Sequence, residues 1–583
     1  MAFGASFGIR HSIFGIPFMT FLPIVDRELR VAARRRTTYL ARIGAAALVI
    51  LIFGGLHVTQ SFRGGMFFSA GQTQFFVLKW LGFLFACSAG VFLTSDALSE
   101  EKREGTLGLL FLTNLRGYDV VLGKFISHSV QAFYGLLAAF PVLALTLLAG
   151  GVSGGEFWRT MLVFCNTLFF SLSVGLLVSS ISRDAMKAIN GTLLLCLLFV
   201  AGLPLADWAV AGWNPMKFTP RLSRASPGYL FVSAGAVMMK GYWLQLGLQH
   251  FLGWTLLAAS SFCTPRAWRD KTAGANASGS SLWRFWRYGT PRGRAALRRK
   301  LLAQDPILWL VMRDRWMPRL VWAVAWLALS LLGWGILHSG DFKVPLTLGY
   351  YAQSLLALVV HLWMASQASR FFVDAVRTGA MELVLVAPVN PPQIVRSQWT
   401  ALLRTFLFPA LLVFGLKVAG GLVAILEMRK AMAGSFAGPG FNLIHFQIVN
   451  LAAGAVNFVA DLLAVAWFGM WMGLTTKKTP MAVVKTFVFV IVLPWLALMF
   501  LQGFAMGLLA FTLGLRAVLW SLGPVVIAAV NLGKDIFFIR WSRRRLLTRF
   551  RDTVARDGPL FAPRPPPLPS ALKPPLVPSA TKP

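Results

Sequence analysis

Directly after an apolar span, the chain reads Ser99-Glu-Glu-Lys-Arg-Glu-Gly-Thr-Leu-Gly-Leu-Leu-Phe-Leu-Thr-Asn-Leu115. A blurred copy of this charged loop, Arg377-Thr-Gly-Ala-Met-Glu-Leu-Val-Leu-Val-Ala-Pro-Val389, follows roughly 274 residues later. The two copies align without a gap, so that Gly379 falls on Gly105 and Leu383 on Leu109. The repeat predicts two related halves, each with a loop of this kind outside the membrane.

The composition indicates a protein whose solvent is largely the lipid bilayer. Of its 583 residues, 57% are hydrophobic and only 13% are charged, which is more apolar surface than a water-soluble core can bury. A membrane-spanning helix needs about 20 mostly apolar residues, because hydrocarbon offers the backbone no hydrogen bonds. The expected fold is all-α, a polytopic membrane protein with about twelve transmembrane helices in two homologous six-helix halves. The expected spans are 38–58, 75–94, 126–150, 157–182, 187–206 and 243–264, then 319–338, 347–372, 398–426, 446–474, 482–511 and 516–539.

Two further pairs of segments support the repeat. An amphipathic segment that begins at Pro23 precedes the first span, as one that begins at Pro306 precedes the seventh. The span end from Gly175 to Arg183 resembles the one from Gly469 to Lys477. The expected domains are a first six-span half at 1–264, a basic cytosolic linker at 265–304, a second six-span half at 305–540 and a basic, Pro-rich, largely disordered tail at 541–583.

The formal net charge of +35 is concentrated in three segments. These are the N-terminal segment, the central linker and the tail, and an even number of spans between them places all three on one side of the membrane. The positive-inside rule makes that side the cytoplasm, so we expect a multi-pass protein of the plasma membrane with both termini cytoplasmic. The same cations attract anionic lipid headgroups, which makes membrane lipids, and not nucleic acid, the expected partners of these segments.

The segment 207–242 departs from this pattern of charge, because it carries four cations although it is assigned to the outside. Its prolines, together with the apolar run from Tyr229 to Met239, favour an element that is partly embedded in the membrane or re-entrant. A simple outside loop is the alternative.

Within the charged loop the sequence predicts a short helix of its own. Residues Ser99 to Glu104 extend the second span, Gly105 ends it, and Thr106 caps a new helix from Leu107 to Asn114. This helix presents more apolar surface than a solvated connector tolerates, so we expect it to dock against a partner. A helix that rests on lipid is the alternative.

The residues Glu101-Lys-Arg-Glu-Gly-Thr-Leu-Gly-Leu-Leu-Phe-Leu-Thr113, followed by Val121-Leu-Gly-Lys-Phe125, resemble the permease subunits of type 2 (ABC-2) ATP-binding-cassette transporters. The resemblance implies that the loop holds a coupling helix, which fits a groove on a separate cytosolic ABC ATPase subunit. It also implies that ATP and Mg²⁺ bind to that subunit, that this chain itself carries no cofactor, and that one chain supplies both permease halves. The coupling residues so implied are Glu101, Glu104, Gly105, Thr106, Leu107, Leu110 and Thr113 in the first half and Gly379, Met381, Glu382 and Leu383 in the second.

The second copy departs from the family pattern. Thr378 replaces Glu104, and Asp374 and Arg377 stand where the first copy has Glu100 and Arg103. The resemblance therefore implies two docking helices of unequal strength, of which the first is the stronger.

Sequence motifs point away from an enzyme. A Walker A loop needs Gly, four residues, then Gly-Lys-Ser or Gly-Lys-Thr, but the segment from Gly117 to Lys124 has one residue too many and is followed by Phe125. The segment from Val152 to Glu156 imitates the signature motif of the ATPase subunits but lies in a loop predicted outside. The four cysteines fall within apolar spans without metal-ligand spacing, so we expect neither catalytic residues nor a metal site.

Ionisable residues inside the predicted spans form a second candidate site, because such groups are costly in hydrocarbon unless they face a partner or water. Asp461 lies near the middle of the tenth span with Asn457 one turn earlier, and Lys417 interrupts the ninth. His361 lies in the eighth. These residues either line a polar pathway or include a buried Asp461–Lys417 pair that fixes packing, and the pair is the favoured interpretation.

The expected function is that of the permease subunit of an ATP-binding-cassette exporter, which moves an unidentified substrate when it is coupled to separate ATPase subunits. One alternative is an ion-coupled secondary transporter, which also commonly has two halves. Another is a non-transporting membrane scaffold or assembly factor. Transport that follows a proton gradient and ignores ATP would favour the secondary transporter, as would a functional Asp461.

Overall fold

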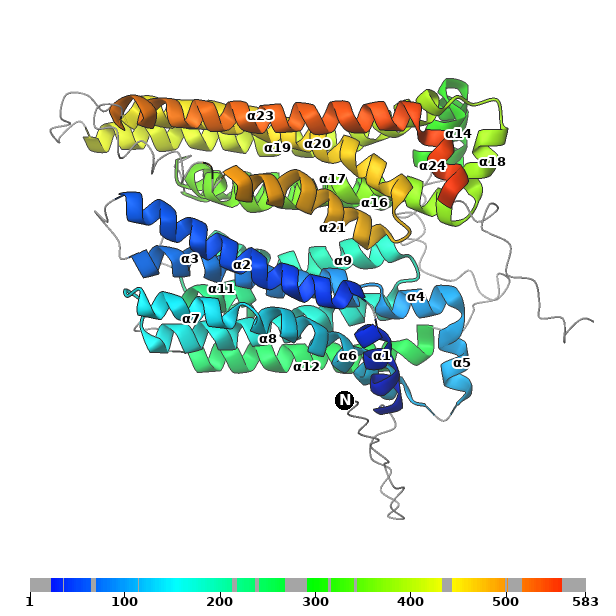
Figure 1. Ribbon diagram of the computed structural model, residues 1–583, viewed down its shortest axis with the longest axis horizontal. Coiled ribbons are helices and arrows are strands. Elements are labelled where there is room, and N and C mark those ends of the chain that lie inside the picture. The colour runs from blue at the N-terminus through cyan, green and yellow to red at the C-terminus, as the bar shows by residue number, and fades with distance from the viewer. Residues whose placement is uncertain are drawn as a thin grey trace, which may run out of the picture. The chain divides into compact units, whose positions relative to one another are not determined.

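A computed structural model describes residues 22–34, 36–63, 70–113, 115–211, 218–235, 241–267, 291–312, 316–339, 343–432, 443–498, 501 and 516–557. All regular structure within these ranges is helical (Figure 1). Residues 268–290 of the predicted linker and the part of the predicted tail after Asp557 lie outside them. The chain divides into two compact units, each taken by itself below. The first comprises 1–278, 333–345 and 496–519, and the second 279–332, 346–495 and 520–583.

In the first unit, each of the six predicted spans falls on helix. The third span starts earlier than expected, because its helix already begins at Gly117. The fifth span contains a π-helical turn between two α-helices. The elements are α1 (Leu22–Arg34), α2 (Arg36–Arg63), α3 (Ala70–Ala89), η1 (Gly90–Thr94), α4 (Ala97–Glu104), α5 (Thr106–Leu112), α6 (Gly117–Leu137), α7 (Phe140–Leu148), α8 (Gly154–Ile181), α9 (Ala185–Leu197), η2 (Leu198–Gly202), α10 (Leu203–Val210), η4 (Ser223–Ala225), α11 (Pro227–Ser233) and α12 (Tyr242–Ala267).

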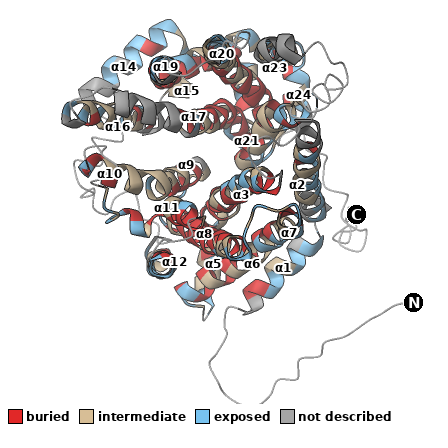
Figure 2. Ribbon diagram, turned by 90° about the vertical axis from the view of Figure 1, so that its left-hand side faces the viewer, coloured by how far each residue is buried: buried red, intermediate tan, exposed pale blue. Residues whose placement is uncertain are grey.

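Helix α8 is the central element of the first unit. It packs against α3, α6, α9 and α12, and Figure 2 shows it largely buried. Small and polar residues mark helix–helix contacts in membranes, and α8 carries several that are buried, among them Ser171, Ser173 and Ser179. Its start is fixed by Ser153, whose hydroxyl accepts a hydrogen bond of 3.2 Å from the backbone N–H of Glu156. The spans around α8 therefore form one packed body on which the charged loop is mounted.

The second predicted span crosses α8 closely at two glycines, of which Gly90 belongs to the span and Gly175 to α8. A Cβ at Gly90 would clash with the backbone carbonyl of Ser171, and one at Gly175 with the hydroxyl of Thr94. At the same place the span changes to a π-helical turn, η1, where Thr94 donates a hydrogen bond of 3.0 Å to the carbonyl of Leu172 in α8. The contact fixes the position of the span directly before the charged loop begins.

The predicted re-entrant segment folds back onto the end of its span. The carboxylate of Asp207 accepts hydrogen bonds of 2.8 Å from the backbone N–H groups of Arg221 and Ser223. The short helix α11 then packs against α8 and α12, with Leu230 and Phe231 buried. The segment is thus anchored to the helix bundle of the first unit, as a folded element and not as a simple loop.

The predicted spans of the second half also fall on helix within the described ranges, although residues 499–500 and 502–511 of the eleventh lie outside them. Eight helices of the described chain are long and apolar enough to cross a membrane, and Ile43–His57 and Val321–Leu337 are shorter apolar helices. The elements are α14 (Pro291–Gln304), α15 (Pro306–Met312), α16 (Trp316–Ser339), α17 (Lys343–Arg377), α18 (Ala380–Val386), α19 (Pro391–Met432), α20 (Leu443–Thr475), α21 (Thr479–Phe487), η5 (Val488–Val492), α23 (Arg516–Thr548) and α24 (Phe550–Asp557).

Short helices gather at one end of the long helices of the second unit. Figure 1 shows α14, α18 and α24 at the same end of α19, α20 and α23. Helix α24 packs against α18 and α20, with Phe550 and Val554 buried. The ring of Phe550 lies 6.0 Å from that of Phe372 in α17. The second copy of the charged loop is thus supported by a helix from the C-terminal part of the chain.

Candidate functional site

The charged loop forms a sharp turn between α4 and α5. Gly105 has a φ of 75°, a left-handed conformation that suits glycine, and it separates the two helices as predicted. The predicted cap is wrong, because Gly105 occupies the N-cap position and the hydroxyl of Thr106 instead donates to the carboxylate of Glu101. Helix α5 is also shorter than expected, since it ends at Leu112.

Glu101 faces the protein interior. Its carboxylate accepts a hydrogen bond of 2.8 Å from Lys124 of α6, and Lys124 also donates over 2.9 Å to Glu28 of α1. Glu101 of the charged loop and Lys124, which follows the loop in sequence, therefore form an ion pair. Glu101 is buried, so it supports the loop from within and does not form its outer surface.

A second set of contacts joins α4 to the end of α8. The hydroxyl of Ser179 accepts hydrogen bonds of 2.9 Å from the backbone N–H groups of Leu98 and Ser99. Lys102 donates to the carbonyl of Ser179 over 3.2 Å, among the last carbonyls of α8. The small polar residues that end the fourth span thus hold the base of the charged loop. With the ion pairs to α6 and α1, they connect α5 rigidly to the spanning helices.

The outer surface of α5 is apolar. Leu107 is buried and Leu110 is half-buried, whereas Leu109 and Leu112 are 65% and 80% exposed. Glu104 and Thr113 are exposed beside them, and the hydroxyl of Thr113 donates to the carbonyl of Leu110. Among the predicted coupling residues, Glu104 and Thr113 are therefore accessible, and the exposed leucines are two that the prediction did not include.

The second copy reproduces this geometry at the predicted offset. Gly379 has a φ of 71°, and α18 begins at Ala380, 274 residues after Thr106. Met381 is buried like Leu107, while Leu383 and Val386 are 71% and 87% exposed. Both short helices therefore present a pair of apolar side chains at corresponding positions.

The two copies differ in the support beneath these helices. The positions of Glu101 and Lys124 are held in the second copy by Ala375 and Gln398, both buried. Gln398 donates a hydrogen bond of 3.1 Å to the carbonyl of Gln367, so a neutral contact replaces the ion pair. The second copy thus lacks both the carboxylate and the ammonium of this ion pair, as expected if each group is needed only to neutralise the other.

Glu382, a predicted coupling residue of the second copy, is also buried. Both of its carboxylate oxygens lack a hydrogen-bond partner within the described ranges. Since α24 packs against the short helix that carries it, Glu382 does not contribute to the exposed surface of α18. That surface consists of Leu383 and Val386.

The intramembrane polar residues form a different ion pair from the one predicted. Lys534 of α23 donates hydrogen bonds of 2.5 Å to Asp461 and 3.1 Å to the carbonyl of Val490 in η5. Lys534 also lies 2.9 Å from the carboxylate of Asp535. The predicted Asp461–Lys417 pair is thus wrong, because the packing of α20 beside α23 brings Lys534 closer to Asp461.

The other polar candidates lie near this cluster without joining it. Lys417 lies against Gly454, where its terminal atoms would be 3.0 Å from an added Cβ. Asn457 is half-buried, and its side-chain oxygen has no hydrogen-bond partner among the described residues. His361 binds the carbonyl of Ala357 over 2.6 Å and packs edge-on against Phe458. No cluster in the described ranges has the ligands to hold a metal ion.

The fold and the loop together define a class, a multi-pass all-helical membrane protein with a rigidly mounted short helix between its second and third spans. Residues 23–257 match the family model described as ABC-2 family transporter protein. The match covers 235 of the 583 residues, less than half of the chain, and for this part it supports the resemblance to ABC-2-type permeases. The match ends before the second half. Among curated proteins, no sequence matches the chain.

Sequence reasoning missed the exposed leucines of α5 and the lysine of the intramembrane cluster. Leu109 and Leu112 lie three residues apart, a spacing that places two side chains on one face of a helix. Lys534 and Asp535 lie within an apolar stretch of the twelfth span, where charged residues are rare and usually paired. Both signals were present in the sequence.

Proposed function

We propose that the protein is the permease of an ATP-binding-cassette exporter in the plasma membrane, with both termini in the cytoplasm. Its two short helices, α5 and α18, dock on separate cytosolic ABC ATPase subunits, which bind ATP and Mg²⁺. One chain supplies both permease halves. The observation that carries the proposal is the exposed apolar pair on each short helix, Leu109 with Leu112 and Leu383 with Val386.

The mechanism follows from how the first short helix is mounted. Exposed apolar side chains on a short helix gain free energy when a groove of a partner covers them. Because Glu101 and Ser179 fix α4 to α6 and α8, a displacement of α5 moves these spans as well. ATP-driven closure of the ATPase subunits would thereby reach the membrane and open a pathway to the other side.

Copurification tests the proposal. The tagged protein is isolated from its native membrane, and the ABC ATPase subunits that remain bound are quantified by mass spectrometry. Leu109→Asp combined with Leu112→Asp is expected to lower the bound ATPase about tenfold or more, since two apolar contacts are lost and two charges are desolvated. Leu148→Asp, at an equally exposed leucine that ends α7, is the matched control. Equal recovery of ATPase with the double variant and the wild type would contradict the proposal.

A second candidate function is supported by the Asp461–Lys534 pair. Ion-coupled secondary transporters place ionisable groups at the depth of the membrane, and Asp461 of this pair lies in α20, which is long and apolar enough to cross one. The two functions differ in their energy source. Transport in vesicles that requires a proton gradient, proceeds without ATP and is lost in Asp461→Asn would favour the secondary transporter over the ATP-driven exporter.

A further inference from the structure

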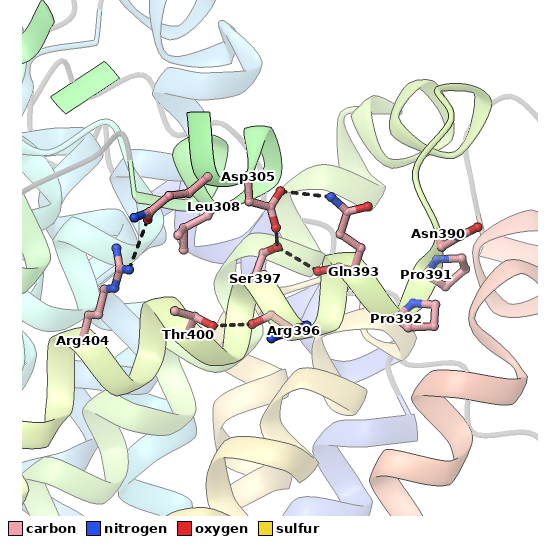
Figure 3. Close-up of a pocket in the computed structure, with 11 residues that line it drawn as sticks. Asp305, Leu308, Asn390, Pro391, Pro392, Gln393, Arg396, Ser397, Thr400 and Arg404 are labelled. Carbon is pink, nitrogen blue, oxygen red and sulfur yellow. Dashed lines mark hydrogen bonds between the residues drawn. The ribbon is translucent and has the colours of Figure 1, made fainter. Parts of the chain in front are cut away.

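The second unit contains an open cleft of about 830 Å³ that the exporter mechanism does not use. It lies where α14 passes into α15 and where α19 begins, as Figure 3 shows. Leu308, Pro391 and Pro392 give it an apolar part, and Arg396 and Arg404 of α19 give it cations. A cleft of this volume is in the range that binds small organic ligands.

The charges in the cleft are unbalanced toward the positive. Within the described ranges neither Arg396 nor Arg404 has a carboxylate partner, and Arg404 only donates a 3.4 Å hydrogen bond to the amide oxygen of Gln304. Asp305 is the one acidic side chain among the described residues that line the cleft, and it is engaged by the protein itself. It accepts hydrogen bonds from the hydroxyl of Ser397 and from the backbone N–H of Ile307 over 2.9 Å.

The position of the arginines along α19 places the cleft at the membrane surface. Helix α19 has 42 residues and is about 63 Å long, roughly twice the thickness of the hydrocarbon core. Between Thr405 and Leu426 its only charged residue is Lys417, and this part has the length that a span requires. Arg404 directly precedes this part, at the level of the lipid headgroups, and Arg396 lies about 12 Å further out along the helix.

Helix α14 lies beside the cleft and carries exposed cations of its own. Arg298, Arg299 and Lys300 are all exposed, and the guanidinium of Arg298 lies 5.6 Å from the ring of Trp309 in α15. Juxtamembrane cations of this kind raise the local concentration of anionic lipids. The cleft is therefore supplied with anionic headgroups from its immediate surroundings.

We propose that the cleft binds the phosphate-bearing headgroup of an anionic phospholipid, with Arg396 and Arg404 as the phosphate ligands. Guanidinium groups form strong, charge-assisted hydrogen bonds with phosphate oxygens. Gln393 and Thr400 also line the cleft. The amide nitrogen of Gln393 donates to Asp305 and the hydroxyl of Thr400 donates to the carbonyl of Arg396, so the side-chain oxygens of both residues remain to accept hydrogen bonds from the glycerol part. Leu308 and the prolines contact the start of the acyl chains. A free phosphate ion has the same chemistry but fills only a small part of the volume.

Lipid retention tests the proposal. The protein is equilibrated in nanodiscs that contain phosphatidylglycerol and phosphatidylcholine in equal amounts, extracted into detergent and analysed for bound lipid by native mass spectrometry. We expect the wild type to retain phosphatidylglycerol in preference to phosphatidylcholine. Arg396→Gln combined with Arg404→Gln is expected to lower the retained phosphatidylglycerol about tenfold or more. Arg396→Lys with Arg404→Lys, which keeps both charges, is expected to restore part of it.

A matched variant separates a specific site from general attraction. Arg299→Gln with Lys300→Gln removes two charges from the adjacent helix without altering the lining of the cleft, and it is expected to change retention less than about twofold. An equal loss in both double variants, or full retention in Arg396→Gln with Arg404→Gln, would overturn the proposal. Unchanged thermal unfolding of the variants shows that they are folded.

A further arm distinguishes lipid from soluble phosphate. Inorganic phosphate is titrated into the delipidated protein in detergent, and the unfolding temperature is followed. We expect a larger rise with phosphatidylglycerol than with inorganic phosphate, and loss of the rise in Arg396→Gln with Arg404→Gln. An equal rise with phosphate alone, without preference for phosphatidylglycerol in nanodiscs, would overturn the assignment to a lipid.

Discussion

Lys124 of α6 and Glu101 of α4 form a buried ion pair over 2.8 Å, and this pair joins the charged loop to the third predicted span. Lys124 is shared with Glu28 of α1 over 2.9 Å, so one ammonium connects three helices. Glu101, which precedes the turn at Gly105, thus holds the charged loop against α6. The apolar residues after Gly105 form the outer surface of the loop.

Removal of this ammonium is expected to destabilise the first half. Lys124→Gln leaves the carboxylates of Glu101 and Glu28 without their cation, and breaking such a pair on one side costs about 3 kcal/mol. Thermal unfolding in detergent measures the loss. Glu104→Gln, at an exposed carboxylate of α4, is the control and should leave the unfolding temperature unchanged. A similar effect of both substitutions would contradict the role of Lys124.

Gly105 is expected to be required for the turn between α4 and α5. Gly105→Ala forces an L side chain into a backbone conformation with φ near 75° and should cost about 1 to 2 kcal/mol. Gly247→Ala in α12 is the control, because that glycine is helical and has open space around it. Alanine there should be neutral or stabilising. Thermal unfolding distinguishes the two, and an equal response would argue against a strained turn.

The two short helices are expected to differ in their contribution to ATPase binding. Leu109→Asp with Leu112→Asp should lower the copurified ATPase more than Leu383→Asp with Val386→Asp, because the position directly before the turn glycine holds an exposed carboxylate, Glu104, in the first copy and Thr378 in the second. The ratio of bound ATPase to permease measures the difference. A larger loss from the second pair would reverse the predicted order.

Lys534 is expected to matter more for stability than Lys417. Lys534→Met leaves both Asp461 and the fully buried Asp535 unpaired and should cost about 3 kcal/mol. Lys417→Met removes a cation that forms no ion pair within the described ranges, so a smaller effect is expected. Thermal unfolding of the two variants provides the comparison, and equal losses would contradict the greater importance of Lys534.

Much of the fold could be predicted because its determinants are local in sequence. Hydrophobic runs of about 20 residues mark the spans, since the bilayer requires such lengths. The turn at Gly105 was predictable from one glycine between a charged and an apolar segment. The offset between Gly105 and Gly379 was likewise visible without a structure, and both residues adopt the same left-handed conformation.

The orientation of side chains in the charged loop could not be derived in the same way. Successive positions on a helix point about 100° apart, so which residues face outward depends on how α4 lies on α8. That contact rests on Ser99 and Ser179, which are 80 residues apart. For this reason the resemblance includes Glu101 among the coupling residues, although its carboxylate faces Lys124.

The intramembrane pair illustrates the same limit over a similar distance in sequence. Asp461 and Lys534 lie 73 residues apart, on helices whose pairing depends on the packing of the whole second unit. Lys417 was the nearer cation in sequence, but proximity in sequence says little about proximity between spans. The π-helical turn η5 adds the carbonyl of Val490 to the contacts of Lys534.

The packing of α24 on α18 has a consequence for the order in which the chain matures during synthesis. The first short helix and its supports, Glu101, Lys124 and Ser179, are all complete once about one third of the chain has emerged. The second short helix lies at 380–386, but the helix that packs against it ends at Asp557. The second site is therefore finished only when synthesis has passed nearly the whole chain, whereas the first is in place long before.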